Sequence, residues 1–277
     1  MKLLSLTLFS AALAAAKQDK CYALALSGGA NNGAWEAGVM WGLAHYGDPD
    51  KYAWDVVTGV SAGAVNTAVA AMWAPNDLVK FTEWYSDVVA NTATHEIWKN
   101  WRLGPLWGLI DKSSLVDDSP MFTYFDEQLK DLGEIKRRFT IAAVDVGTGE
   151  YVTFNQTNTD KDSIAQAAIS SSSIPGAFPP QHFADHILMD GGTVWDINVS
   201  SAINQCLEIV DDPSDIVLDI MICGYDDGPD PVKHTWDWNT IRYKMRENSW
   251  QSFYSGSNSI QEAKELFPTV DYRHLFM

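Results

Sequence analysis

The stretch Val57-Thr-Gly-Val-Ser-Ala-Gly-Ala-Val65 places a serine where a β-branched run passes into small, helix-forming residues. Its centre is a G-x-S-x-G pentapeptide around Ser61, the pattern by which a strand-to-helix turn presents a nucleophilic serine. Glycine is needed on both sides, because a Cβ at Gly59 or Gly63 would crowd the crossing chains. A helix starting at Ala62 would direct unpaired amides toward the serine. The stretch therefore predicts a βα unit with an exposed serine hydroxyl at its turn.

A second glycine-rich turn lies upstream, in Ser27-Gly-Gly-Ala-Asn-Asn-Gly33. A short apolar strand leads into it and a helical pattern follows, so the amides of Gly28, Gly29 and Ala30 are expected at a helix N-terminus. Such amides bind anions or oxyanions. A dinucleotide-binding turn is disfavoured, because that fingerprint requires glycine where Ala30 stands. Both turns open consecutive βα units, so we expect them side by side, as in an acyl-transfer centre.

An aspartate follows a third apolar run, in Ile187-Leu-Met-Asp-Gly-Gly-Thr193. Gly191 and Gly192 allow the turn to close tightly against another backbone. The apolar approach disfavours the ionised carboxylate of Asp190 and so raises its basicity toward what proton abstraction needs. Asp190 is therefore the predicted base for Ser61, and the alternative is an ordinary Asp-Gly turn.

With these three motifs the chain resembles the patatin-like phospholipase family. Two further stretches share the resemblance: Ser171–Pro180, similar to the segment that leads into the family's catalytic aspartate, and Ala142–Phe154, similar to its central strand pair. Several motifs in order are more specific than any one of them. The resemblance implies an α/β layered fold with a mainly parallel central sheet flanked by helices, over roughly residues 22–225.

The family uses a Ser–Asp dyad without a histidine. Carried over, the resemblance implies that Ser61 is the nucleophile, that Asp190 is the general base, and that the amides of Gly28, Gly29 and Ala30 form the oxyanion hole. It also implies a lipid acyl hydrolase, of phospholipase A type or a general acyl-ester hydrolase, that acts in lipid degradation without a cofactor.

The chain departs from the family pattern at Ala30, where a third glycine is usual, and at Asn32, where a lysine or arginine is usual. An alanine still donates its N–H if its φ stays negative, whereas Asn32 removes a cation near the site. These departures motivate a second hypothesis, that the chain is a non-catalytic lipid-binding or storage protein on the same fold.

A third hypothesis is an α/β-hydrolase esterase with a Ser-Asp-His triad, in which His234 or His274 would be the base. It leaves the Asp-Gly-Gly turn at residues 190–192 without a role. His182 and His186 are expected to border the site without acting in it.

The first sixteen residues have the composition of a secretory signal peptide. Lys2 supplies a basic start, Leu3–Ala15 is apolar, and Ala14-Ala-Ala16 suits cleavage. The apolar stretch is too short to span a bilayer. We therefore expect a chain of the secretory pathway, secreted or retained in an endomembrane lumen, with a catalytic domain over residues 22–225 and a C-terminal extension over 226–277.

The remaining apolar patterns predict the order of elements. We expect a helix over residues 34–46, a mainly irregular or helical segment over 78–132, strands over 139–146 and 151–155, helices over 164–169 and 199–209, and a buried strand over 216–223.

The net charge of −17 argues against a nucleic-acid partner and against electrostatic capture by strongly anionic membranes. An acyl lipid at a membrane or micelle surface would have to be approached through apolar contacts. The segment Ile97–Ile110 contains three tryptophans beside Lys99 and Arg102, a composition that suits a lipid interface or a lid over an acyl pocket. Plain core packing explains it equally well.

Three cysteines allow at most one disulfide. Cys206 and Cys223 are expected in adjacent elements and would pair, leaving Cys21 free; the equal alternative is three buried thiols. No metal site is predicted, because the acidic pairs Asp211-Asp212 and Asp226-Asp227 lack the ligand spacing of a calcium loop.

Overall fold

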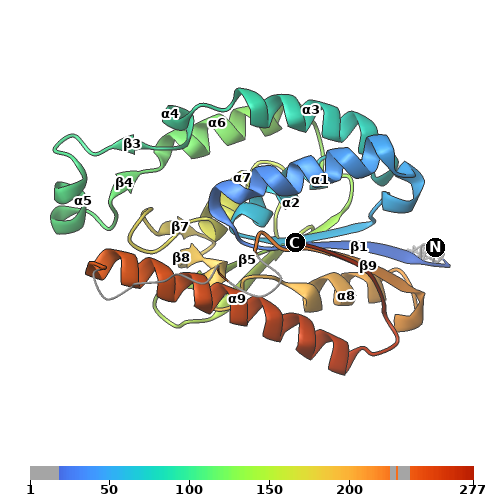
Figure 1. Cartoon of the computed structure of the whole chain (residues 1–277). Helices are drawn as coiled ribbons and strands as arrows, with labels where there is room; N and C mark the ends of the chain where they lie inside the picture. Colours follow the sequence, from blue (N-terminus) through green and yellow to red (C-terminus); the bar gives the residue numbers. More distant parts are fainter. Residues whose placement is uncertain (1–18, 225–228, 230–237) are drawn as a thin grey trace, which may run out of the picture.

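The computed structural model describes residues 19–224, 229 and 238–277 (Figure 1). The expected signal peptide, His234 and the acidic pair at 226–227 lie outside these residues.

An eight-stranded sheet forms the centre of the molecule. Along the sheet the strands are β10 (Asp271–Phe276), β9 (Ile216–Met221), β1 (Cys21–Leu26), β2 (Val56–Val60), β5 (Arg138–Asp145), β8 (His186–Asp190) and β7 (Gln181–Phe183), and β6 (Tyr151–Asn155) also pairs with β5. The first five strands run parallel, whereas β6 and β8 are antiparallel to β5, and β7 is antiparallel to β8. The mainly parallel sheet expected from the sequence is confirmed.

Helices cover both faces of the sheet (Figure 1). One face carries α1 (Gly33–Tyr46), α2 (Ala62–Ala71), α3 (Leu78–Asn91), α6 (Ser119–Lys130) and α7 (Ile164–Ser171), and the other carries α8 (Val199–Leu207) and α9 (Thr240–Leu266). Short 3₁₀ helices are η1 (Ala30–Asn32), η2 (Pro49–Tyr52), η3 (Pro75–Asp77), η4 (Gly191–Thr193) and η5 (Pro213–Asp215). The helices predicted after the first turn and over 164–169 and 199–209 are confirmed within a few residues.

Strand β1 shows why the sheet needs two layers of helices. Leu24 and Leu26 pack into the core under α1 and α2, whereas Cys21, Ala23 and Ala25 pack into the core under α8 and α9. Side chains alternate between the faces of a strand, so a strand that is apolar throughout must be covered on both sides.

The segment over 78–132 leaves the body of the molecule between α3 and α6. It contains α4 (Thr94–Ile97), β3 (Lys99–Asn100), α5 (Pro105–Asp111) and β4 (Val116–Asp117), and β3 and β4 pair as a small antiparallel hairpin that the sequence patterns did not predict. In Figure 1 this part projects at the left of the molecule.

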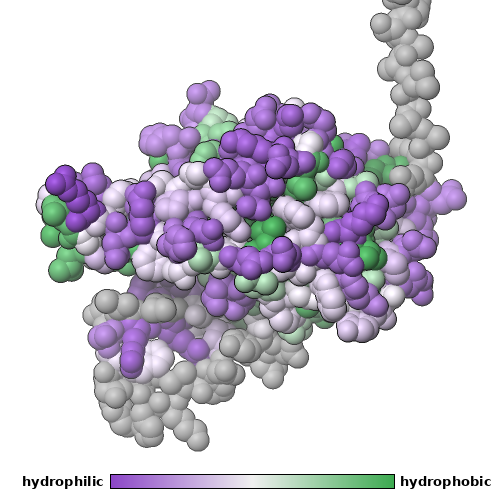
Figure 2. All heavy atoms as spheres, turned by 90° about the horizontal axis from the view of Figure 1, so that it is seen from above, coloured by the Kyte–Doolittle hydropathy of each residue, from purple (hydrophilic) through white to green (hydrophobic). Residues whose placement is uncertain are grey.

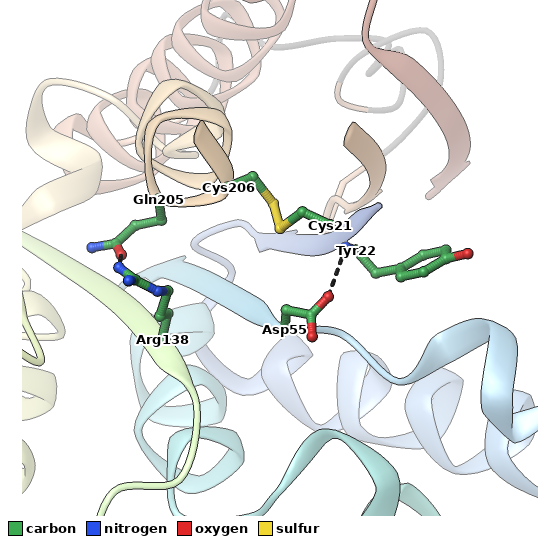
Figure 3. Close-up of a disulfide and its surroundings, with 6 residues drawn as sticks. All are labelled: Cys21, Tyr22, Asp55, Arg138, Gln205 and Cys206. Atoms are coloured by element: carbon green, nitrogen blue, oxygen red, sulfur yellow. Dashed lines mark hydrogen bonds between the residues drawn. A yellow bond between two sulfur atoms is a disulfide. The ribbon is translucent and has the colours of Figure 1, made fainter. Parts of the chain in front are cut away.

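The expected pairing of Cys206 with Cys223 is wrong. A disulfide joins Cys21 to Cys206, with a Cα–Cα distance of 5.6 Å, and Cys223 is free (Figure 3). The C-terminal end of α8 leads toward the start of β9, where Ile216 is in register with Cys21. Cys223 follows the far end of the same strand, roughly 17 Å away at 3.3 Å per residue, so it is out of reach of Cys206.

Hydrogen bonds around the disulfide hold the same end of the sheet together (Figure 3). The Tyr22 amide donates to Asp55 Oδ2 at 3.0 Å, which joins β1 to the start of β2. The Arg138 guanidinium at the start of β5 donates to Gln205 Oε1 on α8 at 3.1 Å. Helix α8 is thus fixed across three strands.

Candidate active site

The register of the sheet brings Ser61 and Asp190 together. Residues 140–144 of β5 pair with β6 on one edge, so β2 and β8 must share the other edge. Strand β2 ends opposite Ala142 with Val60, and β8 arrives antiparallel with Asp190 opposite Ala143. The two strands therefore meet end to end on β5. Their last residues, together with Ser61, lie next to one another.

Ser61 stands at the sharp turn between β2 and α2. Its backbone has φ 53° and ψ −120°, a conformation that residues other than glycine rarely adopt. Its Oγ donates a hydrogen bond to Asp190 Oδ2 at 2.7 Å, and both residues are 5% exposed.

Gly59 and Gly63 are required by the close approach of chains at this turn. A Cβ at Gly59 would lie 2.0 Å from the Gly63 carbonyl oxygen, and a Cβ at Gly63 would lie 2.6 Å from the carbonyl oxygen of Ser27. The Gly63 amide donates to that Ser27 oxygen at 3.1 Å. The start of α2 is thereby fixed against the first glycine-rich turn, and the two turns lie side by side.

The Asp190 carboxylate is held at both oxygens. Oδ2 accepts from Ser61, and Oδ1 accepts from the Gly192 amide at 2.8 Å. Burial raises the pKa of Asp190 from its usual value near 3.8 to about 6, against these two hydrogen bonds, which lower it. A Cβ at Gly191 would lie 2.4 Å from the Ala142 carbonyl oxygen, so the turn is closely packed on β5. An aspartate of this kind is ionised near neutral pH and is basic enough to take a proton.

The amides of the first turn are not equivalent. The Gly28 amide donates to the Asp196 carbonyl oxygen at 2.8 Å, so it is already used. Within the described residues, the amides of Gly29 and Ala30 donate no hydrogen bond. Ala30 has φ 49°, the left-handed conformation that favours glycine, so the negative φ expected for this alanine is not found. Of the three amides expected to form the oxyanion hole, that of Gly28 is thus the one bonded to a described backbone carbonyl.

A buried carboxyl group supports this turn from within α1. Glu36 is fully buried; its Oε1 accepts from the Ser27 amide at 3.1 Å and its Oε2 accepts from Asn66 Nδ2 at 2.7 Å. Asn66 also donates to the Gly33 carbonyl oxygen at 3.0 Å and accepts from the Tyr85 hydroxyl. Burial raises the pKa of Glu36 to about 8, so this group is mostly protonated at neutral pH.

A second carboxyl group lies beside the turn. A Cβ at Gly28 would lie 2.3 Å from Asp196 Oδ1, and one at Gly192 would lie 2.7 Å from the same atom. Burial and the nearby charge of Asp190 raise the pKa of Asp196 well above its usual range. Asp196 is itself held by α9, because its amide donates to Ser255 Oγ at 3.2 Å.

The serine run 171–173 supports Ser61 from the other side. The Ser61 amide donates to Ser171 Oγ at 2.9 Å, and Ser172 Oγ donates to the Ser61 carbonyl oxygen at 2.9 Å. The Asp190 amide donates to the Ser173 carbonyl oxygen at 3.0 Å. Sequence reasoning assigned no role to these serines, although four consecutive serines, 170–173, at the end of an apolar helix were a visible signal. Glu36 was also missed, although it shares the buried stripe of Met40 and Ala44 on α1.

A cavity of about 520 Å³ opens beside Ser61 and is lined mainly by apolar side chains. It runs under α3 and α6, and its walls include Val65, Val69, Trp84, Val88, Val89, Ile97, Trp98, Met121, Phe125, Ile174 and Phe178. Its size and apolar lining suit a hydrophobic ligand. Two residues of the tryptophan-rich segment, Ile97 and Trp98, thus face a cavity rather than a packed core.

The described histidines lie apart from the Ser61 hydroxyl. His274 is on the edge strand β10, where its Nε2 is 3.5 Å from the Tyr52 hydroxyl, and His186 Nδ1 is 3.0 Å from Asp145 Oδ2. In the described ranges no group of three His, Cys, Asp or Glu side chains is placed to hold a metal ion. The helices of the described chain include none long and apolar enough to cross a bilayer.

Comparisons with known proteins identify the family of the chain. A family model described as patatin-like phospholipase matches residues 24–203. A search of curated proteins found no match. Among solved structures, VipD from Legionella pneumophila is 15% identical, with a TM-score of 0.40, and the alignment covers 83% of this chain and 52% of that chain. The ExoU–SpcU complex from the type III secretion system of Pseudomonas aeruginosa is 18% identical, with a TM-score of 0.37, and covers 89% and 52%. The chain thus spans about half the length of these solved structures.

Proposed function

The chain belongs to the patatin-like phospholipase family, and we propose that it is an acyl-lipid hydrolase in which Ser61 and Asp190 form a catalytic dyad. The observation that carries the proposal is the 2.7 Å hydrogen bond from Ser61 Oγ to Asp190 Oδ2, beside an apolar cavity that Ser61 lines. A nucleophile, a base of suitable pKa and a place for an acyl chain are the three parts that ester cleavage needs.

In the first half-reaction Asp190 takes the Ser61 proton while Oγ attacks the ester carbonyl carbon. The resulting oxyanion accepts hydrogen bonds from the Gly29 and Ala30 amides. When the tetrahedral intermediate collapses, the ester C–O bond breaks, and protonated Asp190 returns its proton to the leaving alcohol. The product is an acyl-enzyme on Ser61.

In the second half-reaction water replaces the alcohol. Asp190 takes a proton from the water, the hydroxide attacks the acyl carbonyl, and Ser61 leaves with that proton restored. The acyl chain remains in the cavity through both steps, and the substrate is an acyl lipid drawn from a membrane or micelle surface.

The experiment that tests the dyad is turnover of a short-chain acyl ester, together with labelling by a fluorophosphonate probe. Ser61→Ala and Asp190→Asn are each expected to lose activity by a factor on the order of 10³ or more while remaining folded. Ser86→Ala, at a half-buried position on α3, and Asp131→Asn, at an exposed position, are matched controls and should behave as the parent protein. Parent-like activity in Ser61→Ala would overturn the dyad.

The same experiment separates the alternatives. A folded parent protein that takes no label and turns over no ester, yet binds lipid, would support the non-catalytic hypothesis that Ala30 and Asn32 motivate. Loss of activity in His274→Ala with retention in Asp190→Asn would support a histidine-based triad.

We also propose that the chain enters the secretory pathway and is released after cleavage following Ala16. The Cys21–Cys206 disulfide supports this route, because disulfides persist in oxidising compartments. Sequencing of the secreted protein from its N-terminus should start at Lys17. A start at Met1 would contradict the proposal.

A further inference from the structure

The segment over residues 101–112, here called the tip, carries strongly exposed aliphatic side chains on a projection. Leu106 is 75% exposed and Ile110 is 82% exposed, and Leu103 and Trp107 are exposed with them. In Figure 2 green, hydrophobic spheres gather at the left end, where Figure 1 places α5. A soluble surface rarely keeps such a group together unless it contacts something.

The base of the tip is fixed to the wall of the cavity. The Leu115 amide donates to the Gly176 carbonyl oxygen at 2.9 Å and the Val116 amide donates to that of Ala177 at 3.3 Å. The neighbouring Ile174 and Phe178 line the cavity beside Ser61, as do Ile97 and Trp98 before the tip. The chain on both sides of the tip therefore either lines the cavity or is hydrogen-bonded to the segment that lines it.

Within the tip, Trp101 holds α5 in its projecting position. Its Nε1 donates to the Ser114 carbonyl oxygen at 3.0 Å, and a Cβ at Gly108 would lie 2.6 Å from its ring. Trp101 is half-buried by these contacts, so the apolar side chains of Leu106 and Ile110 are directed elsewhere, into solvent.

Other exposed apolar residues lie at the same end of the sheet. Val146 directly follows β5 at its carboxyl end, and its amide donates to the carbonyl oxygen of exposed Ile187 at 2.7 Å. Exposed Val194 and Trp195 directly follow the Asp190 turn. The end of the sheet that carries Ser61 thus has these exposed apolar side chains in addition to those of the tip.

The charges around the tip differ from those of the whole chain. The chain has a net charge of −17, whereas the tip has two exposed cations, Arg102 and Lys112, against one carboxylate, Asp111, which lies 3.3 Å from Lys112 Nζ. Lys99 at the base of the tip is paired with Asp117 at 3.3 Å. Apolar and tryptophan side chains beside cations are typical of segments that lie at a lipid headgroup boundary.

We propose that the tip inserts into the interfacial layer of a zwitterionic phospholipid bilayer and so brings the mouth of the cavity to the lipid surface. Leu103, Leu106 and Ile110 enter the acyl boundary, and Arg102 contacts headgroup phosphates. A zwitterionic surface is favoured over a strongly anionic one, because the acidic body of the protein is repelled by anionic lipid. The benefit of this docking to catalysis rests on the proposed function, but the docking itself does not require turnover.

The test measures binding to phosphatidylcholine vesicles by flotation, in the Ser61→Ala background so that no lipid is consumed. Leu106→Ser and Ile110→Ser should each weaken binding about tenfold, which corresponds to removing one partly inserted aliphatic side chain. Leu266→Ser is the matched control, because Leu266 is 62% exposed at the end of α9, away from the tip. It should bind as the background protein does.

Unchanged binding in both tip variants, or an equal loss in Leu266→Ser, would overturn the proposal. Binding that strengthens when phosphatidylserine is added would overturn the choice of a zwitterionic surface. In the Ser61-intact protein, the tip variants should turn over a soluble short-chain ester as the parent does while losing activity on vesicles. If the dyad assignment is wrong, the protein should still bind vesicles, and the tip variants should still bind them more weakly. The two proposals can therefore fail separately.

Discussion

At the residue scale, the site concentrates backbone strain on two non-glycine residues. Ser61 and Ala30 have φ values of 53° and 49°. Such conformations cost on the order of 1–3 kcal/mol each and persist only where surrounding contacts impose them. Ser61 is held by Ser171 and Ser172 through its amide and carbonyl groups. The contacts that hold the Ser61 turn also present its hydroxyl to Asp190.

The pH dependence of turnover should follow Asp190. A general base must be ionised, and burial raises its pKa to about 6, so kcat/KM should increase with pH through about 6 and level off above it. The profile is measured on a soluble ester from pH 4.5 to 8, with Asp131→Asn as the control. A flat profile down to pH 4.5 would contradict the assignment of Asp190 as the base.

The stability of the protein should decrease as the pH rises through about 8, because of Glu36. Its pKa is raised from 4.5 to about 8 in the folded state, so the folded protein binds a proton that the unfolded chain releases. The stabilisation is complete below about 4.5 and is lost as the pH approaches 8, by about 1.4 kcal/mol per pH unit at most.

Glu36→Gln isolates this effect, because glutamine does not titrate. The variant loses some stability at every pH, since its amide faces the Asn66 amide, but the difference from the parent should shrink between pH 5 and 8. Urea unfolding at several pH values measures it. Parallel stability profiles for parent and variant would show that Glu36 is already ionised when buried.

At the scale of elements, the disulfide ties α8 to the first strand of the sheet. It closes a loop of 185 residues, for which the chain-entropy model gives stabilisation of about 5 kcal/mol, and measured values are commonly lower. Replacing both Cys21 and Cys206 by alanine should therefore lower the free energy of unfolding by about 2–5 kcal/mol in urea titrations.

Cysteine chemistry provides the control. The non-reduced, unfolded protein should have one reactive thiol, from Cys223, and three after reduction. Cys223→Ala should change the urea midpoint much less than the double replacement does. Three thiols without reduction would show that the chain carries no disulfide.

The segment over 97–110 shows why composition alone could not choose among its alternatives. Its tryptophans have different environments, because Trp98 lines the cavity, Trp101 supports the base of the tip and Trp107 is exposed. The path of the backbone places the three tryptophans in these different environments. A hairpin with strands of two residues leaves no periodic pattern from which that path could be predicted.

At the scale of the whole molecule, the C-terminal residues complete the sheet. Strand β10 pairs in parallel with β9, and Arg273 donates two hydrogen bonds to Asp219, which is fully buried. The Trp54 indole donates to the same carboxylate at 2.8 Å. Arg273 in the last strand thus neutralises a carboxylate next to β1.

Arg273→Ala should destabilise the protein by about 3 kcal/mol or more, because it leaves the Asp219 carboxylate buried with no cation in contact. Arg242→Ala, at an exposed position on α9, is the control and should change stability by less than about 0.5 kcal/mol. Thermal unfolding compares them. An equal midpoint for both variants would show that Asp219 needs no cation.

The sequence by itself determined the βα units around Ser61 and the first glycine turn. These units follow from local causes: a glycine pair at a tight turn, β-branched runs, and helical spacing, each of which acts over a few residues. The mainly parallel sheet was implied by the resemblance that the motifs carry, and the pairing of Ser61 with Asp190 was a hypothesis. The family motifs carry the same local information.

Only the tertiary structure decided which groups meet across the sheet. Strands β2 and β8 share one edge of β5, which brings Asp190 to Ser61. The Asp196 carbonyl oxygen accepts a hydrogen bond from the Gly28 amide, and the length of β9 separates Cys223 from Cys206. The cavity and the exposed tip depend in the same way on helices distant in sequence. Strand register, strand order and helix packing set these contacts. Each of the three depends on two segments that are distant in sequence, so neither segment alone predicts the contact.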